Sequence, residues 1–102
     1  MIVLDHQPRW WFLLQDDDAL LFDVHCSHGP VDYAWTMFLN AAETSQLRAA
    51  GRAFLGALAE QVQSSAPGAR GSNSPFLDRN VDSAVRERVL AAVLQWRKAQ
   101  VG

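Results

Sequence analysis

The chain contains one cysteine and one lysine, and it has no long uninterrupted apolar run. A single cysteine cannot form a disulfide within the chain. The apolar runs are too short to cross a bilayer as a helix, so no membrane segment is predicted. The first residues also lack the positive and apolar stretches of an export signal, and we therefore expect a cytoplasmic protein.

An excess of positive charge is also missing. Nine Lys and Arg residues stand against eleven Asp and Glu residues, which gives a formal net charge of −2. Such a chain has no general attraction for a phosphate backbone, so nucleic acid is not a predicted partner. The excess of arginine over lysine, together with abundant alanine, is typical of a GC-rich bacterial coding sequence.

The length and the apolar content indicate one folded unit. A chain of 102 residues with 49% hydrophobic side chains can bury a single core but not two. This composition lies well away from that of disordered chains. We therefore expect one domain over residues 1–102.

Two apolar segments, at residues 10–14 and 19–26, flank three consecutive aspartates and predict an antiparallel hairpin. With residues 16–18 as a three-residue loop, Gln15 faces Ala19. One face is then wholly apolar and consists of Trp10, Phe12, Leu14, Leu20, Phe22 and Val24. The other face carries Arg9, Trp11, Leu13, Leu21, Asp23 and His25.

A second turn is predicted at Gly29 and Pro30, and a third strand follows over residues 31–39. Burial preferences assign one of its two faces to the core. The side chains on that face are Tyr33, Trp35, Met37 and Leu39.

A helix is predicted to begin after Asn40, because Asn40 and Glu43 have the spacing of a capping box. Its apolar stripe is Leu47, Gly51, Phe54, Leu55, Leu58 and Val62. Glycine within a helix costs about 1 kcal/mol relative to alanine. Gly51 therefore predicts a close crossing by another element, with Trp35 or Trp96 as the side chain that fills the space.

Residues 64–75 are rich in serine, glycine and proline and predict a mobile internal loop. Asp82 or Ser83 then caps a second helix that ends near Ala99. Its apolar stripe is Val85, Val89, Ala92, Val93 and Trp96. The order of elements predicts an α+β fold: a three-stranded antiparallel meander followed by two helices packed on one face, with a short fourth strand allowed at residues 76–80.

Reactive side chains concentrate in the sequence His25-Cys26-Ser27-His28. Successive strand residues point to opposite faces, so His25 and Cys26 cannot hold one ion in a regular strand, and Cys26 is interpreted as a small buried hydrophobe. A metal site built from His25, His28 and either Asp23 or Asp32 is the alternative, although no metal-binding motif supports it. No cofactor is predicted.

Asp23 and His25 lie two residues apart on one strand face, where the carboxylate can orient the imidazole and raise its pKa. This pair is the alternative candidate for general acid–base catalysis, but such pairs also occur on solvated sheet faces. Because the side chains of His25 and Cys26 diverge, they do not form a nucleophilic dyad. No catalytic residue is assigned beyond this alternative.

The first strand is apolar on both faces, so two helices on one side would leave the other side uncovered. Either a terminal segment or residues 76–81 fold over it, or it forms an interface with another protein or with a second copy of the chain in a homodimer. Trp11 is the predicted anchor, because tryptophan often dominates interface energetics. The predicted interface residues are Arg9, Trp11, Leu13, Leu21, Asp23 and His25.

A set of short segments spread over most of the chain carries a resemblance. The segments are Trp11-Phe12-Leu13, Leu21-Phe22-Asp23-Val24-His25-Cys26-Ser27, Leu39-Asn40 with Glu43, Gly51-Arg52, Ser74-Pro75-Phe76 with Asp78-Arg79, and Trp96-Arg97. In these segments the chain resembles small uncharacterised bacterial single-domain proteins, some of which act as immunity partners of polymorphic toxins. The resemblance implies a protein-interaction module that works by steric occlusion, and it brings no catalytic motif.

Overall fold

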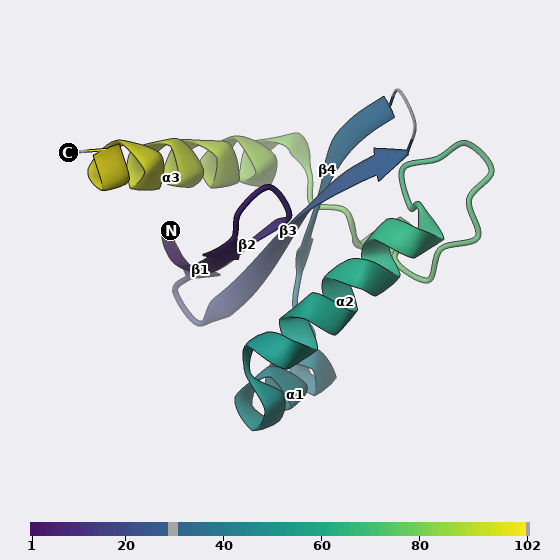
Figure 1. The fold of residues 1–102 in the computed structure, drawn as a ribbon, viewed down its shortest axis with the longest axis horizontal. Coiled ribbons are helices and arrows are strands. Elements are labelled where there is room, and N and C mark those ends of the chain that lie inside the picture. The colour runs from purple at the N-terminus through teal and green to yellow at the C-terminus, as the bar shows by residue number, and fades with distance from the viewer. Residues whose placement is uncertain (29–30, 102) are drawn as a thin grey trace.

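The computed structural model describes residues 1–28 and 31–101, and the side chains of all of these except 28, 31 and 101. Within these residues, four strands form one antiparallel sheet in the order β1-β2-β3-β4, and three α-helices and one 3-10 turn complete the fold (Figure 1). The strands are β1 (Ile2–Gln7), β2 (Trp11–Asp16), β3 (Ala19–His28) and β4 (Val31–Phe38). The helical elements are α1 (Ala41–Ala50), α2 (Arg52–Ser65), η1 (Leu77–Arg79) and α3 (Ser83–Val101). The α+β class and the meander are as predicted, whereas the turn predicted at Gly29 and Pro30 lies outside the described residues.

The fourth strand is β1, at the start of the chain, and not the segment at residues 76–80. That segment forms η1. Directly after it, the Val81 N–H donates a backbone hydrogen bond to the carbonyl of Thr36 in the edge strand β4 (2.9 Å). β1 pairs with β2 and carries an irregularity between Val3 and Asp5. None of its side chains is fully buried, so its sequence lacks the alternation that identified the other strands.

The hairpin between β2 and β3 closes with a two-residue turn, so the predicted three-residue loop is wrong. Asp16 pairs directly with Ala19. Asp17 has a φ of 55°, a left-handed conformation that aspartate adopts more readily than most residues. The shorter turn shifts β2 by one residue against β3 and exchanges the two faces of β2.

Three apolar side chains that were predicted to be exposed are buried, two of them through this shift and the third through α3. Trp11 is 3% exposed and Leu13 is 6% exposed, and both lie on the same face as Phe22, beneath α2. Leu21 is fully buried on the opposite face, against α3. The expectation of an open aromatic face on the sheet is therefore corrected.

The sheet has a core on each side, because α2 and α3 lie on opposite faces of it (Figure 1). The prediction that both helices pack on one face is wrong, because the second predicted helix, α3, covers the other face in place of a terminal segment or residues 76–81. The α2 side buries Trp11, Leu13, Phe22, Val24, Cys26, Trp35, Met37, Leu55, Leu58, Ala59, Val62 and Phe76. The α3 side buries Leu14, Leu21, Val89 and Val93. Trp35 and Met37 thus face the core as predicted, but Thr36 between them is also buried.

The single helix predicted from Asn40 onward is two helices that meet at Gly51. Gly51 has φ 65° and ψ −143°, a conformation essentially restricted to glycine. A Cβ at this position would meet no atom within 4 Å, so the predicted close crossing by Trp35 or Trp96 is wrong. Glycine is needed here because the chain turns from α1 into α2 through this backbone conformation.

Gly51→Ala is expected to lower the free energy of unfolding by about 1 to 3 kcal/mol, because alanine is strained at this φ and ψ. Gly56 is the matched control, since it lies within α2 and a Cβ added there would also meet no atom within 4 Å. Gly56→Ala should raise the stability by about 1 kcal/mol through helix propensity. Urea denaturation of both variants checks the pair, and equal effects at the two positions would contradict the assignment of Gly51 as a hinge.

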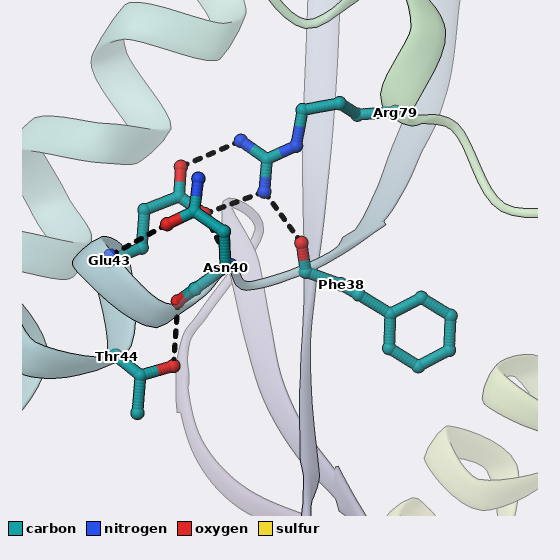
Figure 2. Close-up of polar contacts among 5 residues, drawn as sticks. All are labelled: Phe38, Asn40, Glu43, Thr44 and Arg79. Atoms are coloured by element: carbon teal, nitrogen blue, oxygen red, sulfur yellow. Dashed lines mark hydrogen bonds and ion pairs between the residues drawn. The ribbon is translucent and has the colours of Figure 1, made fainter.

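The start of α1 is held by the predicted capping box and by an arginine from a distant segment (Figure 2). The Glu43 N–H donates to Asn40 Oδ1 (2.8 Å), and the Asn40 N–H donates to Glu43 Oε1 (2.9 Å). Arg79 of η1 donates to both carboxylate oxygens of Glu43 (2.6 and 2.7 Å) and to the Phe38 carbonyl (2.6 Å). This network joins the end of β4, the start of α1 and η1.

The segment between α2 and η1 contains several serine hydrogen bonds. The hydroxyls of Ser65 and Ser74 lie 2.7 Å apart, and the Ser72 hydroxyl donates to the Ser65 carbonyl (3.1 Å). The predicted mobility of residues 64–75 stays a prediction. α3 then begins at the predicted cap, where the Val85 N–H donates to Asp82 Oδ1 (2.9 Å). Within the described ranges, no helix combines the length and the hydropathy required to cross a membrane.

Candidate functional site

A cleft of about 390 Å³ lies where the sheet meets the C-terminal half of α3. Its lining residues are Arg9, Trp10, Phe12, Asp23, His25, Ala34 and Arg97. We call it the α3 cleft. Its volume falls within the range of pockets that bind small molecules. A second, smaller hollow of about 230 Å³ lies between β1 and α3 and is lined mainly by apolar side chains.

The walls of the α3 cleft come from β2, β3, β4, α3 and the turn between β1 and β2. Arg9 and Trp10 lie in that turn, where Arg9 has a φ of 65°. The His25 N–H donates to the Trp10 carbonyl (2.7 Å), which ties the turn to β3. Arg97 reaches the cleft from α3, with its guanidinium 5.7 Å from the centre of the Phe12 ring. The turn and the helix therefore close over the polar part of β3.

Asp23 supplies a carboxyl group whose pKa is raised. Burial raises the pKa of Asp23 from its ordinary value, and three opposing influences do not cancel it. The strongest is the hydrogen bond that Thr36 Oγ1 donates to Asp23 Oδ1 (2.6 Å), followed by the charges of Arg86 and His25. A carboxyl with a raised pKa in a cleft is a frequent feature of functional sites.

His25 is exposed and faces the neighbouring strand. Its Nε2 lies 4.0 Å from Asp32 Oδ1, and both side chains are more than half exposed. The side chain of His28, the third ligand of the alternative metal site, lies outside the described residues. Among the side chains that the structure describes, no group of three His, Cys, Asp or Glu is placed to hold a metal ion.

Cys26 is fully buried and is a free thiol, as its interpretation as a small hydrophobe predicted. Burial raises the pKa of this thiol, which keeps it in the neutral, unreactive form. Its Sγ points toward the Val24 carbonyl at 3.9 Å. The thiol is therefore part of the core beneath α2 and not of the cleft.

The structure brings together half of the predicted interface residues. Arg9, Asp23 and His25 line the α3 cleft, whereas the other three, Trp11 among them, are buried in the two cores. The predicted anchor, however, is not on the surface.

Sequence reasoning missed four of the cleft residues. Trp10 and Phe12 were assigned to the core face by the shifted register, and Ala34 was assigned to the less buried face of its strand. Nothing in the sequence indicated that Arg97 lines the cleft, because nothing in it places α3 against a particular face of the sheet. The predicted strand at residues 10–14 is apolar on both faces, and this pattern indicated that a second helix must cover the other face of the sheet.

No protein-family model matches the chain, and comparison with curated proteins and with solved structures gave no match.

Proposed function

We propose that this chain is a cytoplasmic protein-interaction module that binds another protein at the α3 cleft. The observation that supports the proposal is the cleft itself, which combines aromatic walls, arginines and a carboxyl group on one surface. Leu94 is 56% exposed and lies three residues before Arg97 on α3, so it neighbours the cleft on the helix surface. Leu90, one turn earlier, is 59% exposed. Apolar side chains beside a polar rim are typical of protein interfaces.

The resemblance to immunity partners of polymorphic toxins fits this proposal. A module of this size would act by covering a functional surface of its partner, and it would need no catalytic group. The interface of the proposal consists of Arg9, Trp10, His25 and Arg97 with the exposed leucines of α3, in place of the buried Trp11.

Photo-crosslinking in cells of the source organism tests the proposal. A photoreactive amino acid is placed at Arg97, on the rim of the cleft, and as a matched control at Arg48, an exposed arginine on α1. We expect a discrete adduct with one protein from position 97 and none from position 48. An adduct between two copies of the chain would identify a homodimer, and equal labelling from both positions would contradict the proposal.

A second candidate function is acid–base or metal chemistry that uses Asp23, His25 and His28. The raised pKa of Asp23 beside His25 favours this alternative. Elemental analysis of the purified protein tests its metal form. Stoichiometric zinc that disappears in His25→Ala would support it over the interaction module.

A further inference from the structure

The α3 cleft contains two arginines, Arg9 and Arg97, that form no ion pair with any carboxylate among the described residues. Three arginines elsewhere each lie within 2.8 Å of a carboxylate oxygen. The pairs are Arg52 with Asp5, Arg79 with Glu43, and Arg88 with Asp16. In contrast, Arg9 and Arg97 have no carboxylate within 4.0 Å in the described part of the chain. These two arginines are available to an external anion.

Asp23 does not cancel this charge. Its carboxyl is engaged by the Thr36 hydroxyl at 2.6 Å and is further offset by the charge of Arg86, which belongs to the same helix as Arg97. Asp32 lies beside His25 and is 60% exposed. The region around Arg9 and Arg97 is therefore a local excess of positive charge on a chain whose net charge is −2.

Apolar surface adjoins the two arginines. The guanidinium of Arg97 lies 5.7 Å from the centre of the Phe12 ring, which restricts the arginine to the cleft wall. Trp10 and Ala34 complete the apolar part of the lining. A group that fills the cleft therefore needs an apolar part as well as a negative charge.

We propose that the α3 cleft recognises an acidic segment of the partner protein, in which a side-chain carboxylate contacts Arg9 and Arg97 and the adjacent apolar side chain packs on Trp10 and Phe12. This inference rests on the proposed interaction function and adds the chemistry of the partner. Arginine suits this role, because its planar guanidinium donates two parallel hydrogen bonds to one carboxylate.

Titration of the full chain with short blocked peptides, monitored by NMR, tests the inference. The probe is the tetrapeptide Gly-Glu-Leu-Gly, and its neutral match is Gly-Gln-Leu-Gly. We expect the glutamate peptide to shift the indole N–H signal of Trp10 and to bind about fivefold more tightly than the glutamine peptide, as one exposed ion pair allows. The difference should shrink as ionic strength rises.

Matched variants test whether the two cleft arginines cause the difference in affinity between the peptides. The double substitution Arg9→Ala and Arg97→Ala should abolish the difference between the two peptides. Arg48→Ala with Arg70→Ala removes the same charge from exposed positions outside the cleft and should preserve the difference. Asp23→Asn, which removes the carboxylate from the cleft, should strengthen binding of the glutamate peptide.

Three results would overturn the inference. These are equal binding of the two peptides, an equal loss in both arginine double variants, and binding of free acetate as tight as that of the glutamate peptide. If crosslinking at position 97 succeeds while the peptides bind equally, the interaction function stands and the acidic segment is wrong. If the peptides differ but no crosslinked protein is found, the cleft binds acidic groups and the interaction function is wrong.

Discussion

Phe22→Ala is expected to lower the free energy of unfolding by about 3 to 5 kcal/mol. Phe22 is fully buried in the core beneath α2, and its ring centre lies 5.6 Å from that of Trp11. Its strand partners are Leu13 on β2 and Met37 on β4, both of which are also buried. Because strands and helix hold the site on every side, the cavity left by the ring cannot close. A loss of this size is a large part of the about 5 to 15 kcal/mol that stabilises a small domain.

Phe38→Ala is the matched control on the next strand. Phe38 is 41% exposed, and Figure 2 shows its ring directed away from the Glu43–Arg79 network. Its truncation should cost less than about 1 kcal/mol. Urea denaturation monitored by tryptophan fluorescence measures both variants. Should Phe22→Ala fail to fold, Phe22→Leu retains most of the volume and should cost about 1.5 kcal/mol or less. Equal costs at positions 22 and 38 would contradict the burial of Phe22 and the exposure of Phe38.

Arg79→Met is expected to destabilise the protein by about 2 kcal/mol, because it leaves the Glu43 carboxylate without its charged donor. The side chain of Arg79 is 25% exposed and that of Glu43 is 12% exposed, so water replaces the lost hydrogen bonds poorly. The substitution also removes the donor to the Phe38 carbonyl, which links η1 to the end of β4. Methionine keeps most of the apolar stem and isolates the effect of the charge.

The pH dependence of this network has a defined direction. Burial alone would raise the pKa of Glu43, but the hydrogen bonds from Arg79 and from the Asn40 N–H outweigh it and lower the pKa below 4.5. A carboxylate with a lowered folded-state pKa stabilises the protein fully above its unfolded-state pKa. The contribution falls as the pH drops below 4.5 toward the folded-state pKa. The cost of Arg79→Met should therefore be larger at about pH 7 than at about pH 3.

Arg88→Met is the control for this prediction. Arg88 donates to Asp16 at 2.7 Å, a distance similar to those in the Arg79 pair, but its side chain is 54% exposed. Exposed pairs of this kind contribute at most about 1 kcal/mol. Denaturant titrations at the two pH values compare the variants. A cost for Arg79→Met that equals the cost for Arg88→Met, or that is the same at both pH values, would contradict the role assigned to the buried pair.

Local sequence patterns correctly predicted the features that depend on residues close together in the chain. The capping box at Asn40 and Glu43 depends on residues three apart, and the cap at Asp82 depends on the first turn of α3. The periodic stripes of the helices and the burial of Cys26 follow equally from neighbours in the chain. These features involve short-range geometry, so the sequence was sufficient for them.

Three of the seven residues of the candidate site followed from the sequence. Asp23 and His25 share a strand face because alternate residues of β3 must do so, and Arg9 lies close to them at the end of the hairpin. Phe12 was placed on the wrong face, since a two-residue and a three-residue turn are both compatible with three consecutive aspartates. The left-handed conformation of Asp17 decides between the two turns.

The sequence by itself determined the fold class, the starts of α1 and α3, and the side of β3 on which the reactive side chains lie. Only the tertiary structure decided the register of β2, the pairing of β1 and the side of the sheet that α3 covers. Each of these depends on contacts between segments far apart in the chain, where several arrangements bury similar apolar area. The α3 cleft exists because α3 covers the second face, which brings Arg97 to the carboxyl group and the imidazole of β3.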